Sequence, residues 1–191
     1  MYVLTYSLLD QKINCFTPLS PESRSLLFEH IRPVQLLKGE ILVEEGKICR
    51  SIYFIDKGLI RSFKDKDGKE INLDFSLEGS FVTHLKSLRK EIPADYGLQA
   101  IEPAWIWEFP KAELLDCYSR SREIESFGRQ LLEQLLMQQQ DHTLLFKALT
   151  PAERYQYIAD HHPALFQRVS LTQLSSYLGI ARETVSRIRG K

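Results

Sequence analysis

The chain has 191 residues, of which 43% are hydrophobic, so it is long enough to bury the core of one large or two modest domains. Its 25 basic and 25 acidic residues cancel, so overall charge neither favours nor excludes a polyanionic partner. Cys15, Cys49 and Cys117 lie far apart, which excludes a zinc ribbon and a disulfide scaffold and favours a reducing cytoplasm. The start of the chain lacks a basic leader region and no apolar run approaches ~18 residues, so we expect neither a secreted nor a membrane protein.

A short helix and then a series of strands are predicted for the first part of the chain. Ser20 can cap the helix, Pro21 suits its first turn, and Pro33 is expected to end it. From Leu36 to Phe109, short runs of β-branched and aromatic residues alternate with glycines, which is typical of a sandwich or jelly roll. Asp67-Gly68 is the best hairpin turn. The strands are expected at residues 40–43, 52–55, 59–63, 70–75, 97–101 and 105–109.

Beyond Pro110 the apolar residues follow a helical period, which predicts a short helix at 111–118 and a long one from Arg122 to Leu149. The long helix is apolar on more than one face, so two surfaces must cover it. One is its own β domain, and we infer that the other is a second subunit, which makes the chain a homodimer through this helix. The alternative is a helix wrapped within one chain, because the heptad register is poorly kept. Thr150-Pro151 then starts a small helical domain.

The most informative pattern lies near the end of the chain, where two short helices are joined by a glycine. Ser170 can cap the first helix, and Gly179 can end it in the left-handed conformation. A second helix follows from Ala181 to Arg189, so the segment predicts a helix-turn-helix. One face of this second helix is apolar, and the opposite face carries Arg182, Glu183, Ser186 and Arg187.

Those four polar residues are of types suited to base edges in DNA. Arginine can donate two hydrogen bonds to guanine, and glutamate can accept one from cytosine. Arg189 and Lys191 flank the helix and are candidates for phosphate contacts. From Arg168 onward there are five basic residues against one acidic residue, a local net charge of +4. The positive charge therefore gathers where DNA binding would need it.

These parts, in this order, resemble the Crp/Fnr family of bacterial transcription regulators, and the resemblance covers nearly the whole chain. Its most specific residues are Leu178-Gly179-Ile180, the segment Arg182 to Arg187, Lys38-Gly39-Glu40, Glu45-Gly46 and Ile52 to Gly58. The resemblance implies an α+β fold with an N-terminal antiparallel β-roll, a long dimerisation helix and a small helix-turn-helix domain. The corresponding domains are residues 1–120, 121–149 and 150–191. The short tail is similar to that of a subgroup frequent in Bacteroidetes.

The resemblance also implies roles for particular residues and partners. Arg182, Glu183, Ser186 and Arg187 would read bases, and Ser170 and Thr172 would contact phosphates. The partners implied are double-stranded DNA and RNA polymerase. Because the sequence stops at Lys191, the β-hairpin wing of the family is expected to be reduced or absent, which should weaken DNA binding.

The effector site departs from the pattern of the cyclic-nucleotide-binding members, which use a Gly-Glu pair and a later Arg-Ser or Arg-Ala pair. The corresponding pairs here are assigned as Gly79-Ser80 and Ala94-Asp95, so an acid stands beside the place of the phosphate and would repel it. We therefore expect no usual response to cyclic AMP, and the effector is unknown. The degenerate effector pocket would comprise Gly79, Ser80, Phe81, Ala94, Asp95 and Tyr96.

Other chemistries are less well supported by the residues. Cys15 alone near the N-terminus cannot hold an iron–sulfur cluster, and a metal-dependent cupin would need several histidines where the β region has only His84. No nucleophile or phosphate-loop motif occurs, so we expect no enzyme, no metal and no identified cofactor. An alternative function is a ligand-binding signalling or scaffold module whose C-terminal helices dock a protein.

Overall fold

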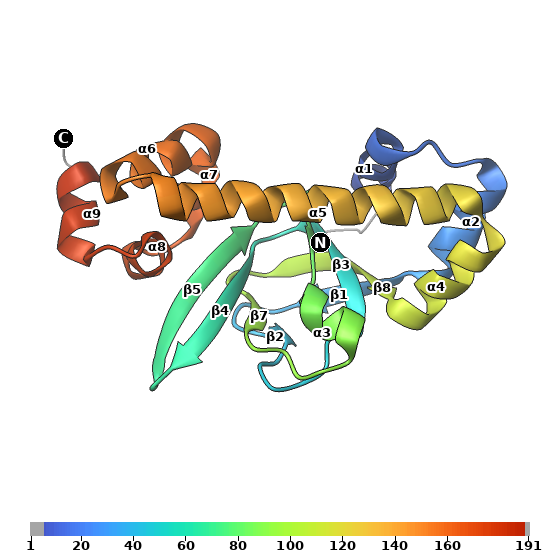
Figure 1. Cartoon of the computed structure of the whole chain (residues 1–191), viewed down its shortest axis with the longest axis horizontal. Helices are drawn as coiled ribbons and strands as arrows, with labels where there is room; N and C mark the ends of the chain where they lie inside the picture. Colours follow the sequence, from blue (N-terminus) through green and yellow to red (C-terminus); the bar gives the residue numbers. More distant parts are fainter. Residues whose placement is uncertain (1–5, 190–191) are drawn as a thin grey trace.

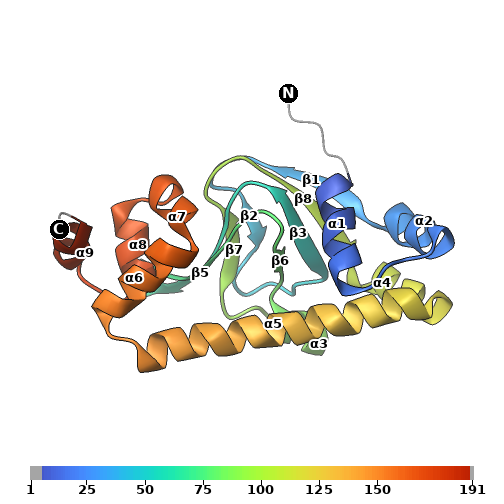
Figure 2. The ribbon, with the colours of Figure 1, turned by 90° about the horizontal axis from the view of Figure 1, so that it is seen from above.

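The computed structural model describes the backbone of residues 6–189 and the side chains of residues 6–185. Two antiparallel sheets form a β domain beside a long helix, and smaller helices gather at both ends of that helix (Figures 1 and 2). The helices are α1 (Ser7–Phe16), α2 (Pro21–His30), α3 (Leu85–Lys90), α4 (Lys111–Arg120), α5 (Arg122–Ala148), α6 (Pro151–His161), α7 (Pro163–Arg168), α8 (Leu171–Leu178) and α9 (Arg182–Arg189). Among the residues described, no helix is both long and apolar enough to cross a membrane.

Each sheet has four strands, in the orders β1-β8-β3-β6 and β2-β7-β4-β5. The strands are β1 (Arg32–Leu36), β2 (Ile41–Val43), β3 (Ser51–Lys57), β4 (Ile60–Lys66), β5 (Lys69–Ser76), β6 (Phe81–Val82), β7 (Gly97–Ala100) and β8 (Ala104–Pro110). The turn between β4 and β5 uses Asp67 and Gly68, both at positive φ, in agreement with the predicted hairpin. The α+β fold is thus confirmed, with its antiparallel β domain, long helix and C-terminal helices.

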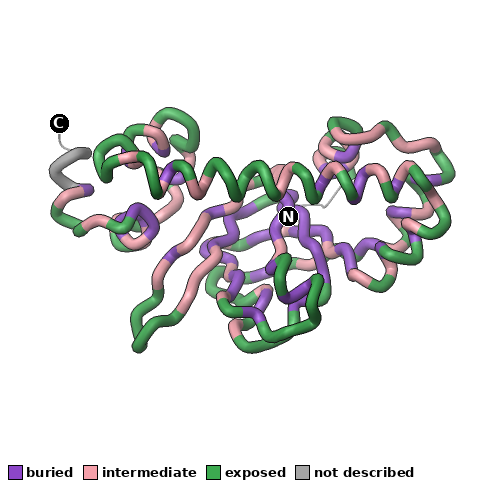
Figure 3. The backbone as a smooth tube through the Cα atoms, in the orientation of Figure 1, coloured by how far each residue is buried: buried purple, intermediate pink, exposed green. Residues whose placement is uncertain are grey.

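Successive side chains of β3 and β8 point to opposite faces of the sheet, so these two strands contribute to two separate cores. Phe54 and Trp107 face the helices, where they pack with side chains of α1, α2, α4 and α5. Ile55 and Ile106 face the opposite way, into the space between the two sheets. The burial pattern in Figure 3 follows this division, with buried residues concentrated in the β domain and on the covered side of the long helix.

All six predicted strands are present, but β1, β6, α1 and α3 were not predicted. The helix that Pro33 was expected to stop ends at His30, and Pro33 itself lies within the next element, β1. A proline is tolerated there because β1 is an edge strand, where the ring need not donate to a neighbour. The assignment of residues to three domains stays a prediction, since α5 contributes Phe127 to the core beside the β domain and Leu145 to the core of the C-terminal helices.

The long helix α5 is only partly covered. Ser121 caps it by accepting a hydrogen bond from the backbone N–H of Ile124. Its buried side chains lie mostly in the first part of the helix, against α1, α2 and α4. Four large apolar side chains between the middle and the end of the helix are 44% to 64% exposed, namely Leu132, Leu136, Met137 and Leu144. These side chains are thus not covered within the single chain that the structure describes.

The C-terminal helices are fastened to the β domain through β5. The backbone N–H of Asn72 donates to Ser176 Oγ at 3.0 Å, and its side-chain amide donates to the carbonyl of Gln173 at 3.2 Å. Asn72 is itself oriented by the buried guanidinium of Arg61, whose Nη1 lies 2.9 Å from Asn72 Oδ1. Phe75 and Tyr177 meet edge to face at 5.4 Å. Helix α8 therefore sits on β5 through specific polar and aromatic contacts.

Arg168 forms a second fastening at the end of α7. Its Nη1 and Nη2 donate to the two oxygens of Glu78 at 2.8 and 2.7 Å, and Nη2 also donates to Glu102 Oε1 at 2.5 Å. Burial alone would raise the pKa of Glu78, but the hydrogen bonds from Arg168 hold it below its usual value. The charge of Arg168 is thus used within the chain, so it adds little to the positive charge predicted for the C-terminal segment.

Removing this clamp should loosen the C-terminal helices. We expect Arg168→Met to lower the free energy of unfolding by about 1–3 kcal/mol, because it leaves two partly buried carboxylates without their cation. Urea titration would measure this change. The matched control is Arg120→Met, whose exposed pair with Asp116 should be worth less than about 0.5 kcal/mol. Equal effects of the two variants would show that the clamp contributes nothing beyond an exposed ion pair.

A close approach between α4 and α5 gives a second prediction. A Cβ atom on Gly128 would lie 2.0 Å from Tyr118 Oη, and the ring is held between the helices. In an open helix Gly→Ala gains about 1 kcal/mol, whereas overpacking here costs about 1–3 kcal/mol. We expect Gly128→Ala to lower the thermal midpoint. Combining it with Tyr118→Leu should recover part of the loss, and a stabilised single variant would contradict the close contact.

Candidate nucleic-acid interface

The local chemistry at the C-terminus builds two short helices joined by a tight turn. The Ser170 hydroxyl accepts from the Gln173 N–H at 3.1 Å, and the Gln173 side chain accepts from the Ser170 N–H at 3.0 Å, which makes a reciprocal capping box. Gly179 ends α8 in the left-handed conformation at φ 67°. The predicted cap, the glycine turn and the second helix are all confirmed in place.

Apolar packing fixes the angle between these two helices. Val185 of α9 is completely buried, as is Leu178 of α8, and both belong to one cluster with Tyr155 and Ile158 of α6. Ser175 is buried as well, as a small residue between closely packed helices should be. The pair α8–α9 therefore rests on α6 as a three-helix unit, and α9 has one docked face.

The opposite face of α9 is free in the part that the structure describes. Arg182 and Glu183 are exposed, and neither forms an ion pair with any residue described. The side chains of Ser186, Arg187 and Arg189 lie outside the described residues, as does the whole of Lys191. The backbone of α9 nonetheless runs to Arg189, so the predicted helix has its expected length.

Ser170 and Thr172 lie at the N-terminal end of α8, and both are exposed. The Ser170 hydroxyl accepts from the backbone, which leaves its hydrogen for donation to an outside acceptor. The first N–H groups of a helix and its dipole also favour an anion at this end. The geometry is therefore compatible with the phosphate contacts that were predicted for these two residues.

The six residues expected around an effector pocket are not brought together. Gly79, Ser80 and Phe81 line a hollow of about 240 Å³ whose other walls are Lys12 and the α5 residues Leu131, Gln134, Leu135 and Gln138. Ala94, Asp95 and Tyr96 take no part in it. The reason is that the turn at Gly79-Ser80 is hydrogen-bonded to Ile55, which directs it towards α5. Gly79-Ser80 and Ala94-Asp95 therefore do not line the same hollow, and their assignment to one effector pocket stays a prediction.

His84 is the residue that faces Asp95 instead, and sequence reasoning missed it. The imidazole is buried, and its Nδ1 accepts from the Ser87 N–H at 3.1 Å, which caps α3. The other ring nitrogen, Nε2, lies 2.8 Å from Asp95 Oδ1 and 3.2 Å from the backbone nitrogen of Asp95. Lys86 Nζ lies 3.0 Å from the other oxygen. Hydrogen bonds from Lys86 and His84 lower the pKa of Asp95 to about 2, so the carboxylate is ionised but compensated.

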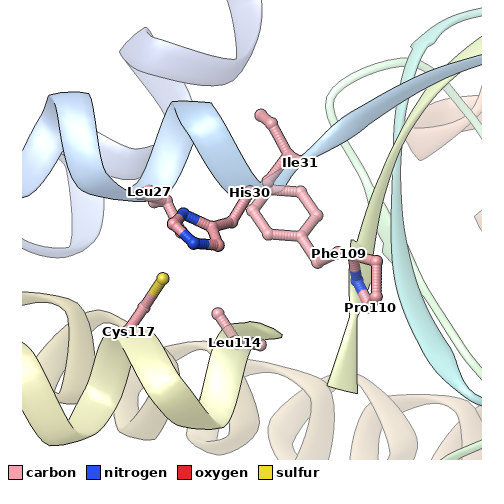
Figure 4. A pocket seen from close by; sticks show the side chains of 7 residues that line it. All are labelled: Leu27, His30, Ile31, Phe109, Pro110, Leu114 and Cys117. Atoms are coloured by element: carbon pink, nitrogen blue, oxygen red, sulfur yellow. The ribbon is translucent and has the colours of Figure 1, made fainter. Parts of the chain in front are cut away.

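A second, smaller hollow lies between α2, β8 and α4 (Figure 4). Its volume is about 140 Å³, and its lining is mostly apolar, consisting of Leu27, His30, Ile31, Phe109, Pro110, Leu114 and Cys117. His30 Nδ1 lies 2.7 Å from the carbonyl oxygen of Leu26, and burial raises the pKa of the Cys117 thiol. This hollow is a packing gap between helices, with an inert thiol.

Comparison with known proteins agrees with this architecture. The model of the cyclic nucleotide-binding domain matches residues 33–121. The anaerobic regulatory protein of Haemophilus influenzae is 27% identical over 177 residues, covering 86% of this chain and 67% of that protein. The fumarate and nitrate reduction regulatory protein of Yersinia pestis is 27% identical over 178 residues, covering 86% of this chain and 69% of that protein. These relatives are regulatory proteins.

Solved structures share the fold. FixK2 from Bradyrhizobium japonicum superposes with a TM-score of 0.68 at 20% identity, covering 84% of this chain and 83% of that one. The catabolite activator protein of Thermus thermophilus superposes with a TM-score of 0.58, also at 20% identity, covering 94% of this chain and 85% of that one. Residues 33–121 thus match the cyclic nucleotide-binding domain, and the chain is similar to regulatory proteins of the Crp/Fnr type and shares the fold of these solved structures.

Proposed function

We propose that this protein is a sequence-specific, DNA-binding transcription regulator that reads base edges with the helix Ala181 to Arg189. The observation that carries the proposal is the two-faced packing of α9. Val185 is completely buried, while Arg182 and Glu183 are exposed without an ion pair among the described residues. Such a helix presents an arginine and a carboxylate to a groove without first breaking contacts. Ser186 and Arg187 belong to the same predicted face.

The proposed regulator is a homodimer paired through α5. The exposed side chains Leu132 and Leu136 follow each other along one strip of the helix, and Met137 and Leu144 follow each other along a neighbouring strip. Water-exposed leucines at these spacings are stabilised when a second helix covers them. A two-fold axis then relates two copies of α9, which suits a palindromic site with half-sites about 34 Å apart. Double-stranded DNA and RNA polymerase are the proposed partners, and the proposed location is the cytoplasm.

We expect Arg187→Ala and Arg182→Ala to reduce affinity for the preferred sequence by ~1 to 3 kcal/mol and to relax discrimination at one base position. Lys191→Ala is the matched control, since a phosphate contact should weaken all sequences about equally. Selection of bound duplexes from a random pool supplies the preferred sequence, and gel shifts measure the variants. Equal losses on selected and random duplexes in all three variants would contradict base reading.

The salt dependence of binding separates this proposal from a module that docks a protein. Affinity for DNA should fall steeply with salt concentration, whereas docking through an apolar face should not. A recovered palindrome would support the dimer at the same time, because its symmetry mirrors that of the protein.

We also propose that the β domain does not respond to cyclic AMP in the usual way. The Asp95 carboxylate already accepts hydrogen bonds from His84 and Lys86, and a pKa of about 2 keeps it ionised throughout the physiological range. The proposal rests on the assignment of Ala94-Asp95 to the place of the family's Arg-Ser or Arg-Ala pair, where the arginine that would attract the phosphate is missing. Isothermal titration with cyclic AMP should release no binding heat, and gel-shift affinity should not change. Saturable binding of cyclic AMP to the wild-type protein, accompanied by a change in gel-shift affinity, would contradict the proposal.

A further inference from the structure

A second arginine of the C-terminal unit lacks the partners that Arg168 has. Arg154 lies in the first half of α6, with its guanidinium 5.2 Å from the centre of the Phe146 ring. Its Nη1 lies 3.8 Å from the position that a Cβ on Gly179 would occupy, so the group sits beside the turn between α8 and α9. Its Nε is buried and has no hydrogen-bond partner among the described residues.

The hydrogen-bonding capacity of Arg154 is not satisfied in this state. The guanidinium carries five N–H donors and cannot lose its charge. A buried donor without an acceptor is destabilising, and most such donors in folded proteins are paired. Among the side chains that the structure describes, no carboxylate forms an ion pair with Arg154, whereas Arg168 is held by Glu78 and Glu102. The ring of Phe146 offers a cation–π contact, which leaves the N–H groups unused.

The position of Arg154 in the fold indicates which kind of hydrogen-bond acceptor its guanidinium would bind. Gly179 is exposed and precedes Arg182 by only three residues, so Arg154 lies next to the beginning of the proposed reading helix. When the first residues of such a helix meet base edges, a backbone phosphate is the anion nearest to the preceding turn. A planar guanidinium suits two phosphate oxygens well.

We propose that Arg154 binds a phosphate of the DNA backbone at the turn between α8 and α9. This inference rests on the proposed function and adds a contact from a third helix to the interface. The competing explanation is purely structural, in which the cation only stabilises the C-terminal end of α8 through the helix dipole and packs on Phe146. The two explanations differ in how the salt dependence of DNA binding should change.

The test compares the wild-type protein with Arg154→Gln and Arg154→Lys on a selected duplex and on a random duplex. For Arg154→Gln we expect affinity for both duplexes to fall by at least about tenfold for each protomer. The slope of log K against log salt should become shallower by about 0.9 for each protomer. Arg154→Lys should keep most of the slope, because it keeps the charge. Arg120→Gln, on the distant helix α4, is the matched control and should change neither quantity.

A lowered melting temperature of Arg154→Gln with an unchanged salt slope would overturn the proposal in favour of the structural role. If that variant does not fold, the wild-type protein and Arg154→Lys still decide, using duplexes in which single phosphates are replaced by neutral methylphosphonates. One replacement should weaken the wild type and have a smaller effect on Arg154→Lys. If replacement of the same phosphates lowered the affinity of both proteins to the same extent, the proposed contact of Arg154 would be contradicted. Failure of the wild type to bind any duplex would instead overturn the proposed function itself.

Discussion

The proposed DNA-binding surface depends on one packing constraint, which is that α9 has a single apolar side and buries it. Val185 enters the cluster that also holds Leu178, Tyr155 and Ile158, so the helix cannot rotate without exposing that side chain. The left-handed Gly179 sets the direction in which the helix leaves α8, at a φ that other residues adopt only with strain. Arg182 and Glu183 face water because the opposite side is fixed. Pre-orientation of this kind lowers the entropy that binding must overcome.

The same three-helix unit is not independent of the β domain. Any movement of α8 away from β5 must separate Asn72 from Ser176 and Gln173, and must also break the ion pairs of Arg168 with Glu78 and Glu102. Charged, partly buried pairs of this kind resist separation because the carboxylates would be left without their cation. The position of α9 is thereby coupled to the β4–β5 hairpin and to the loops that carry the two glutamates. A change in the β domain has a defined set of contacts through which to reach the helix-turn-helix.

The helix-turn-helix could be predicted from sequence because its determinants are local. A serine cap, a glycine end and the spacing of leucines lie within twenty residues of one another, and each acts on its immediate neighbours. Six strands could also be predicted from their local pattern, whereas the edge strand β1, which contains Pro33, and the two-residue strand β6 could not. The surroundings of Asp95 were harder to predict. Which residue faces Asp95 depends on where the chain turns after β6, and the cap that His84 provides for a six-residue helix leaves little trace in the sequence.

The distribution of charge was the least predictable part of the interface. The net charge of the segment counts Arg168 and Arg182 equally. In the structure, however, Arg168 is paired with two glutamates, whereas Arg182 is exposed to water. Arg154 was outside the counted segment, yet the fold carries it to the turn before α9 and gives it no carboxylate among the described residues. Affinity for a polyanion follows the cations that stay unpaired in three dimensions, because only these release counterions when DNA binds. The relevant positive charge is therefore a property of the packed helices α6, α8 and α9, and the net charge of the last segment is a poor measure of it.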